Sequence, residues 1–277
     1  MRVGVVQMRS GLDPCANADT AEGLIREAAG QGAELIATPE MTTLLCAKPR
    51  SLFGTLPGGE PGEVARFEAL ARELGAFLLI GSMPVALDHR PGHRRAANRS
   101  YLFGPQGRIA TYDKVHLFDV ELDTGETWRE SAVYAGGREA VVARAGEATL
   151  GLSICYDLRF PAVYRTLARA GAEVLCVPAA FTVPTGQAHW EVLLRARAIE
   201  TGSWVIAPAQ GGAHEDGRVT YGHSMVVDPW GAVAARLDHD APAVLMAELD
   251  LARVAEVRRR VPALSLETRP ALRIYPA

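Results

Sequence analysis

Short apolar runs alternate along this chain with segments whose apolar residues recur at helical spacing. The apolar runs predict strands at residues 2–7, 33–38, 76–82, 100–103, 109–112, 140–143, 148–154, 173–177 and 204–207, and three antiparallel strands between residues 222 and 249. The periodic segments predict helices at residues 17–30, 62–74, 160–170, 187–201 and 251–260. Asn17 or Asp19 is expected to cap the first helix. This order predicts an α/β protein.

Two segments repeat one pattern. Residues 31–39 read QGAELIATP and residues 170–178 read AGAEVLCVP. Each segment follows a predicted helix and is followed by another helix and another apolar strand, which is the mark of an internal structural repeat. No linker-like composition separates the two parts. We therefore expect residues 1–277 to form a single domain in which two related halves build one α/β sandwich.

Residues 113–137 show neither strand nor helix periodicity. A loop of this length inside a compact domain usually serves the function of the protein. We therefore expect this segment to contribute to a site.

Composition and charge narrow the possible partners. Hydrophobic residues make up 48% of the 277 residues and charged residues 22%, which allows a sizeable core. The formal net charge is −3, and no Lys/Arg cluster suggests a nucleic-acid partner. No apolar run reaches the roughly 18–20 residues that span a bilayer, and residues 1–8 do not resemble a signal peptide. We expect a soluble, cytoplasmic protein with no membrane partner.

Metal and disulfide chemistry find little support in the sequence. The four cysteines, Cys15, Cys46, Cys155 and Cys176, form no C-x-x-C pair, and the histidines do not show metal-ligand spacing. Four cysteines in a chain of this length do not suggest a disulfide framework. We expect free thiols, no metal and no organic cofactor.

One of these thiols, that of Cys155, lies at a predicted strand-to-helix turn, a position typical of catalytic nucleophiles. Cys155 follows the apolar run LGLSI and precedes YDLRFP and a predicted helix. A cysteine at a strand-to-helix turn lies near the positive end of a helix, which favours a thiolate and offers backbone N–H groups to an oxyanion. The alternative is a buried structural cysteine, and the local sequence leaves both readings open. Cys176 lies in the middle of a predicted strand, and we expect it to be a buried structural cysteine.

Three charged residues are candidate partners for such a thiol. Glu40 directly follows the first copy of the repeat, whereas Ala179 occupies the matching place in the second copy, so the repeat itself does not require a carboxylate. Lys114 begins the long irregular segment, and its cation suits an oxyanion. Glu130 lies in the same segment. Taken singly, each also fits an ordinary surface charge.

Together these segments resemble the nitrilase superfamily of carbon–nitrogen hydrolases, which uses a glutamate, a lysine and a cysteine in that order. The matching segments are PEM around Glu40, YDKVHLF around Lys114 and ICYDLRFP around Cys155. The resemblance covers essentially the whole chain. It implies an α-β-β-α sandwich, and a homodimer or higher homo-oligomer paired through helices near the catalytic cysteine. Asp113 departs from the family pattern, which often has arginine or a similar residue there.

Within the family, three further segments resemble the amidases that act on deaminated glutathione. These are FDVE at residues 118–121, AHWEVLLRARAIET at residues 188–201 and YGHSMVVDPWG at residues 221–231. The resemblance implies that such an enzyme cleaves a small carboxylate-bearing amide into 2-oxoglutarate and Cys-Gly.

The resemblance also implies roles for individual residues. Cys155 would attack the carbonyl, Glu40 would carry the proton, and Lys114 with the Tyr156 N–H would hold the oxyanion. Glu130 would orient Lys114 and Glu40. Residues implied to bind the substrate are Tyr156, Arg159, Phe181 and Thr182. Arg159 suits a bidentate contact with a carboxylate, and an ion pair at the start of a helix is the equal alternative.

Other activities remain open at this stage. An ω-amidase acting on 2-oxoglutaramate would use the same residues. A nitrile or N-carbamoyl hydrolase fits the three additional segments less well. A binding protein that keeps the fold without turnover is the alternative from a different class, and the complete set of glutamate, lysine and cysteine argues against it.

Overall fold

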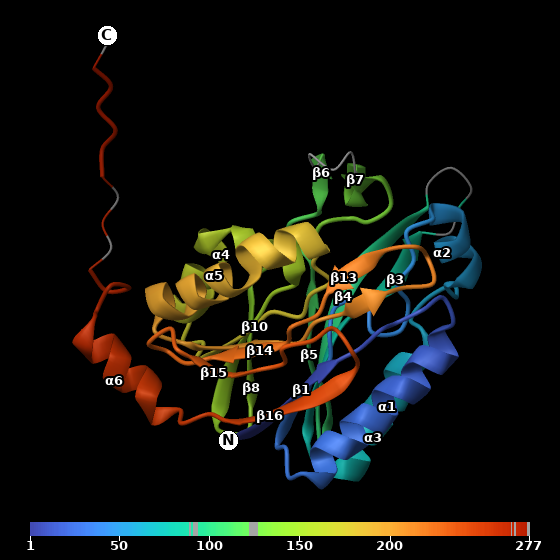
Figure 1. Ribbon diagram of the computed structural model, residues 1–277, viewed down its shortest axis with the longest axis horizontal. Coiled ribbons are helices and arrows are strands. Elements are labelled where there is room, and N and C mark those ends of the chain that lie inside the picture. The colour runs from blue at the N-terminus through green and yellow to red at the C-terminus, as the bar shows by residue number, and fades with distance from the viewer. Residues whose placement is uncertain (89, 91–93, 122–126, 267, 269, 276–277) are drawn as a thin grey trace.

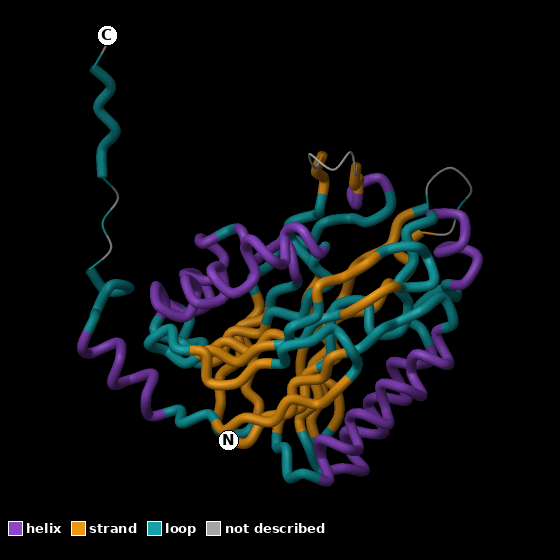
Figure 2. Tube along the Cα trace, in the orientation of Figure 1, coloured by secondary structure: helices purple, strands orange, loops and turns teal. Residues whose placement is uncertain are grey.

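Two six-stranded sheets lie face to face between layers of helices (Figures 1 and 2). The structure is a computed structural model that describes residues 1–88, 90, 94–121, 127–266, 268 and 270–275. Apolar side chains from both sheets form the main core, among them Val5, Leu79, Leu150 and Val174. The arrangement is the expected α-β-β-α sandwich.

The first sheet has the strand order β16-β1-β2-β3-β4-β5. Its strands are β1 (Arg2–Gln7), β2 (Leu35–Ala37), β3 (Phe77–Asp88), β4 (Arg95–Gly104), β5 (Gly107–Asp113) and β16 (Ala243–Glu248). The three strands β1, β2 and β3 are parallel, and the other pairings are antiparallel. The helices α1 (Pro14–Gly30) and α3 (Gly62–Leu74) cover its outer face (Figure 1), where residues such as Ile25 and Phe67 form a second apolar cluster.

The second sheet repeats this plan with the order β15-β14-β11-β10-β9-β8. Its strands are β8 (Val141–Ala145), β9 (Ala148–Leu152), β10 (Val174–Cys176), β11 (Trp204–Ala207), β14 (Met225–Val227) and β15 (Val233–Arg236). Here β9, β10 and β11 are parallel, and the other pairings are antiparallel. The helices α4 (Pro161–Arg169) and α5 (Val183–Thr201) lie on the outer face (Figure 1). The two copies of the sequence repeat contain β2 and β10, so the prediction of two related halves is confirmed.

The predicted N-terminal cap of the first helix was wrong. Asp13, not Asn17 or Asp19, caps α1, accepting the N–H of Cys15 at 2.9 Å. Asn17 is buried instead, and its amide donates to the carbonyl of Thr43 at 2.7 Å. A polar side chain this deep is held because it satisfies a buried loop carbonyl.

The three C-terminal strands do not form one antiparallel unit. Strands β14 and β15 pair in the second sheet, but β16 crosses to the first sheet and pairs with β1. The crossing covers the edge of β1, whose N–H and C=O groups would otherwise lack a neighbour. Local periodicity cannot distinguish these pairings, because each strand alone has the same pattern.

Segment 113–137 contains more regular structure than expected. It contains the antiparallel strand pair β6 (Asp119–Glu121) and β7 (Thr127–Arg129), followed by the 3₁₀ turn η1 (Glu130–Ala132). Elements absent from the predictions are α2 (Pro49–Thr55), β12 (Gly211–Ala213), β13 (Val219–Tyr221) and the 3₁₀ turn η2 (Cys155–Arg159). The chain's final helix is α6 (Ala252–Arg260). Among the described residues, no helix combines the length and apolar character needed to cross a bilayer.

Candidate active site

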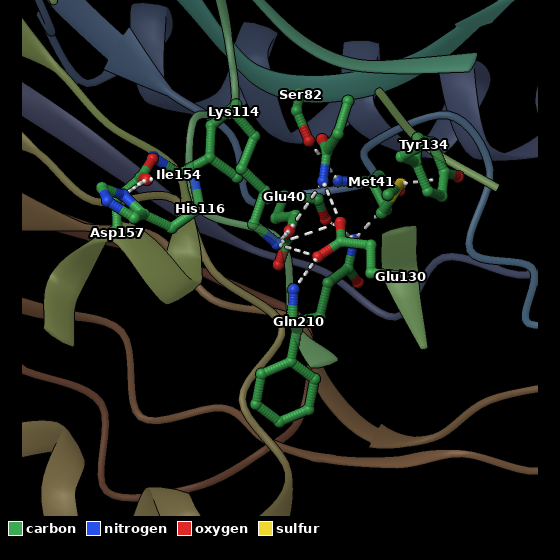
Figure 3. Close-up of polar contacts among 12 residues, drawn as sticks. Glu40, Met41, Ser82, Lys114, His116, Glu130, Tyr134, Ile154, Asp157 and Gln210 are labelled. Atoms are coloured by element: carbon green, nitrogen blue, oxygen red, sulfur yellow. Dashed lines mark hydrogen bonds and ion pairs between the residues drawn. The ribbon is translucent and has the colours of Figure 1, made fainter. Parts of the chain in front are cut away.

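The predicted catalytic residues lie at the ends of strands from both sheets. Glu40 follows β2 and Cys155 follows β9, so each stands just beyond the carboxyl end of a parallel strand. Lys114 directly follows β5, and Glu130 begins η1. Because the sheets pack face to face, strand ends that are far apart in the sequence meet at one place (Figure 3).

Lys114 joins the two glutamates. Its ammonium donates to Oε1 of Glu40 at 2.8 Å and to both carboxylate oxygens of Glu130 at 3.1 and 2.9 Å. Figure 3 shows its amino group between the two carboxylates. Lys114 and Glu40 are buried, and the Glu130 side chain is 12% exposed. Ion pairs this well shielded from water are screened little by salt.

The pairing sets the charge of both groups. Burial by itself raises the pKa of Glu40, but the Lys114 ammonium and hydrogen bonds from Cys155, Lys114 and Asn98 lower this pKa below its ordinary value. Burial lowers the pKa of Lys114, but the carboxylates of Glu130 and Glu40 raise this pKa well above its ordinary value. The site therefore holds a carboxylate beside a fixed ammonium.

Cys155 stands in a strained turn beside Glu40. Its φ is +49°, which is unusual for a residue other than glycine, and such strain gathers at functional positions. Its backbone N–H donates to the carbonyl of Pro178 at 2.9 Å. The thiol is buried, and the Glu40 carboxylate, the Lys114 ammonium and the Ala180 N–H all influence its pKa.

The surroundings of Cys155 favour the neutral thiol over the thiolate that the strand-to-helix turn alone would favour. Burial and the negative charge of Glu40 raise the pKa of the Cys155 thiol well above its ordinary value, and the Lys114 cation offsets this only partly. The turn that follows Cys155 is η2, and α4 begins only at Pro161, so no α-helix starts at the sulfur. A neutral thiol beside an ionised carboxylate can transfer its proton to that carboxylate when the sulfur attacks a carbonyl.

Sequence reasoning missed the residues that hold this cluster together. Asn98, buried in the middle of β4, donates from its amide to Glu40 at 2.9 Å and to Glu130 at 3.2 Å. The Phe118 N–H donates to Oε2 of Glu130 at 2.6 Å. An asparagine inside a strand is unfavourable unless its side chain has a task, and that conflict was the available signal for Asn98.

Asp157 fixes the loops that carry the lysine and the cysteine. It is fully buried and accepts the N–H of Ile154 at 2.9 Å and the N–H of His116 at 3.0 Å. The hydroxyl of Tyr112 donates to it at 2.7 Å. One carboxylate therefore ties the residue before the nucleophile to the segment that follows Lys114 (Figure 3).

The charge that departs from the family pattern is neutralised nearby. Asp113 receives two hydrogen bonds from the Arg99 guanidinium, at 2.6 and 2.9 Å. Its carboxylate is therefore paired on β4 and does not add free negative charge beside Lys114.

The cluster opens into a pocket of about 740 Å³. All the residues expected to bind substrate line it: Tyr156, Arg159, Phe181 and Thr182. This volume suits a small ligand. Lining residues that sequence reasoning missed include Trp128, Ala180 and Arg218.

Arg159 lines this pocket and rests on aromatic rings. Within the described part of the chain, no ion pair links it to a carboxylate. Its guanidinium lies over the rings of Tyr156 and Phe181, at 5.9 and 5.5 Å from their centres, and contacts the His189 ring nitrogen at 3.3 Å. A guanidinium held on two rings is ready for a planar anion.

Metal chemistry gains no candidate site from the fold. Among the residues that the structure describes, no group of three or more His, Cys, Asp or Glu side chains is arranged to hold a metal ion. The groups at the site are a thiol, two carboxylates and an ammonium, which suit proton transfer and covalent catalysis at a carbonyl.

Comparisons with known proteins agree with this chemistry. The deaminated glutathione amidase of Synechocystis is 41% identical over 262 residues, covering 94% of this chain and 95% of that protein. The crystal structure of the Caenorhabditis elegans NitFhit protein has a TM-score of 0.88 and 34% identity; it covers 96% of this chain, which spans 64% of that protein.

A third protein shows a reactive cysteine on this fold. A mutant of the amidase from Nesterenkonia sp. AN1, with a TM-score of 0.75, 26% identity and coverage of 96% of this chain and 100% of that one, carries acrylamide added at its active-site cysteine. The sequence pattern of the family described as carbon-nitrogen hydrolase matches residues 2–259. The chain therefore belongs to the carbon–nitrogen hydrolase family.

Proposed function

We propose that this protein is an amidase that hydrolyses the amide bond of deaminated glutathione, giving 2-oxoglutarate and Cys-Gly. The observation that carries the proposal is the largely buried Glu40–Lys114–Glu130 cluster, which lines the same pocket as Cys155. The substrate follows from the 41% identity to the Synechocystis enzyme of that name. Arg159 lines the same pocket and forms no ion pair with any described carboxylate, which suits a substrate with a carboxylate.

Acylation begins with proton transfer from Cys155 to Glu40. The sulfur attacks the amide carbonyl, and Lys114 with the Tyr156 N–H stabilises the oxyanion. As the tetrahedral intermediate collapses, Glu40 returns the proton to the leaving nitrogen. The products of this half-reaction are a thioester on Cys155 and the free amine of Cys-Gly.

Deacylation uses the same carboxylate a second time. Glu40 takes a proton from water, and the resulting hydroxide attacks the thioester carbonyl. Collapse of this intermediate releases 2-oxoglutarate, and Cys155 recovers its proton from Glu40. Glu130, bonded to Lys114 through both oxygens, keeps the ammonium in position through both steps.

Arg159 is proposed to bind the carboxylate of the 2-oxo acid half. A guanidinium can form two parallel N–H···O hydrogen bonds with one carboxylate. Tyr156, Phe181 and Thr182 also line the pocket. An ω-amidase acting on 2-oxoglutaramate would need the same contact with the 2-oxo acid half. The two activities therefore differ in the leaving group that the pocket must accommodate, which is Cys-Gly for deaminated glutathione and ammonia for 2-oxoglutaramate.

We also propose that the protein works as a homodimer. Val192 and Ile199, one heptad apart on α5, are 67% and 55% exposed. Leu272, Ile274 and Tyr275 are at least 78% exposed in a tail that extends from the sandwich (Figure 1). Apolar groups this exposed favour burial against a second copy.

We further propose that residues 1–277 form a single domain. We also propose a cytoplasmic location, because the four cysteines are free thiols and disulfides are rare in the cytosol.

A panel of amides tests the proposed reaction. Deaminated glutathione, 2-oxoglutaramate and a neutral amide are compared by kcat/KM, and the acyl-enzyme is trapped and identified by mass spectrometry. We expect a 2-oxoglutaryl group on the peptide containing Cys155 and the highest kcat/KM for deaminated glutathione. A higher value for 2-oxoglutaramate would reassign the enzyme as an ω-amidase.

A further inference from the structure

A second arginine, which the proposed mechanism does not use, lines the same pocket. Arg218 lies between β12 and β13, and its Nε donates to Oδ2 of Asp216 at 2.7 Å while its backbone N–H donates to Oδ1 at 3.0 Å. Asp216 is itself fixed, because its side chain is 2% exposed and accepts the Ala47 N–H at 2.9 Å. The arginine is therefore held in one orientation.

That orientation leaves the far end of the guanidinium available. Its carbon lies 5.6 Å from the ring centre of Trp128, which also lines the pocket, and the side chain is 22% exposed. Asp216 takes the Nε, and no hydrogen bond within the described residues uses the two Nη groups. A charged donor fixed by a buried carboxylate and an aromatic ring loses little conformational entropy on binding an anion.

Arg159 and Arg218 are held in the pocket lining by different neighbours. Arg159 rests on Tyr156 and Phe181, whereas Arg218 rests on Trp128 and Asp216, and the two sets share no residue. Both arginines line the pocket that contains Cys155. The pocket thus offers two separate guanidinium groups to a ligand placed on the nucleophile.

The charge of the lining agrees with an anionic ligand. Among the described residues, the lining cations are Lys114, Arg129, Arg159 and Arg218, and the lining carboxylates are Glu40, Glu130 and Asp216. Arg129 is paired with Glu121 outside the lining. The two carboxylates around Lys114 outnumber its one ammonium, whereas Arg159 and Arg218 carry two positive charges against the one negative charge of Asp216. The positive charge of the lining is therefore carried by Arg159 and Arg218.

We propose that Arg218 binds the terminal carboxylate of the leaving group, the Cys-Gly half of the substrate. The inference rests on the proposed function, because deaminated glutathione carries one carboxylate on each side of the scissile amide. Arg159 then serves the acyl side and Arg218 the leaving side. Arg218 is a specificity residue that favours peptide-like amides ending in a carboxylate over 2-oxoglutaramate, whose leaving group is ammonia.

The test compares Arg218→Gln with the wild-type enzyme on three substrates: deaminated glutathione, its C-terminal glycinamide analogue and 2-oxoglutaramate. We expect kcat/KM for deaminated glutathione to fall roughly 10–100-fold, as for a lost hydrogen bond to a charged group. The values for the other two substrates should stay within about twofold, since neither has the carboxylate that Arg218 binds. The double variant Asp216→Asn/Arg218→Gln, which leaves no buried carboxylate unpaired, should show the same selective loss.

Arg129→Gln is the matched control, because Arg129 also lines the pocket but pairs with Glu121 and its side chain is 52% exposed. A selective loss in this variant instead of Arg218→Gln would overturn the proposal, as would an equal loss on all three substrates or an unchanged kcat/KM for deaminated glutathione. A wild-type enzyme that hydrolyses only 2-oxoglutaramate would refute the proposed substrate and this role together.

Discussion

At the scale of single residues, the chemistry of the site depends on whether Cys155 or Glu40 carries the thiol proton. The Cys155 thiol keeps its proton because burial and Glu40 raise its pKa, and Glu40 stays ionised because Lys114 and its hydrogen bonds lower its pKa. The proton therefore moves to Glu40 only when a substrate carbonyl is there to accept the sulfur. This arrangement protects a buried nucleophile from reaction before substrate binds.

Replacing the sulfur tests this directly. We expect Cys155→Ala to lose at least ~10⁴ in kcat, because the covalent step has no substitute, while circular dichroism and the melting temperature stay close to wild type. Cys176, buried in β10, is the matched control, and Cys176→Ala should retain turnover. Turnover by Cys155→Ala would contradict the mechanism.

The pH dependence of kcat/KM tests the support given by Asn98. Glu40 accepts a proton only as a carboxylate, so activity falls as the pH drops through its pKa, which lies below the ordinary glutamate value. Asn98 is one of the groups that lower this pKa. Asn98→Leu should therefore move the acid limb of the pH–rate profile to higher pH. An acid limb unchanged from wild type would argue against this role.

Ser100→Ala serves as the control for that profile. Ser100 is buried on the same strand, but its hydroxyl donates to the Ile80 carbonyl and not to the site. Its acid limb should match that of the wild-type enzyme.

At the scale of elements, the site depends on how closely the strand ends approach. A Cβ on Gly81, in β3, would lie 2.0 Å from the Thr38 carbonyl oxygen and 2.5 Å from Cβ of Pro178. Thr38 lies two residues before Glu40, and the carbonyl of Pro178, which follows β10, accepts the backbone N–H of Cys155 at 2.9 Å. The side chain of Gln210 adds a bond from the other half of the chain, donating to the Glu40 carbonyl at 3.0 Å. Backbone contacts thus set the distance between the two catalytic turns.

We expect Gly81→Ala to disrupt both stability and activity. The clash is with backbone, which cannot move without shifting Glu40, so a loss of about 3 kcal/mol or more in the free energy of unfolding is expected. Urea unfolding and kcat/KM measure the two effects. Gly23→Ala is the control, because nothing lies within 4 Å of a Cβ at that position in α1. It should add about 0.5–1 kcal/mol of stability without changing activity; a Gly81→Ala protein as stable and active as Gly23→Ala would contradict this account.

At the scale of the whole molecule, two similar halves supply different residues to one site. The first half and its following loop give Glu40, Lys114 and Glu130, and the second half gives Cys155. The inner faces of the sheets form the shared core, and α4 and α5 remain on the outside of the second sheet (Figure 1).

Sedimentation equilibrium tests the proposed homodimer. The 29.7-kDa chain should sediment at twice its mass, and Val192→Asp/Ile199→Asp should shift it toward the monomer, because two charges would have to be buried in the interface. Both side chains are exposed on α5, so the monomer should stay folded. A variant that remains dimeric would place the interface elsewhere.

The sequence by itself determined the strands and helices of the two repeats and the identity of the catalytic candidates, because periodicity and the segments around Glu40, Lys114 and Cys155 are local properties. Only the tertiary structure decided the contacts of Asn98, Asp157 and Arg218, the crossing of β16 and the protonation of Cys155. Each of these depends on neighbours distant in the sequence: pairing, burial and charge act through space, and the order of residues along the chain does not specify them.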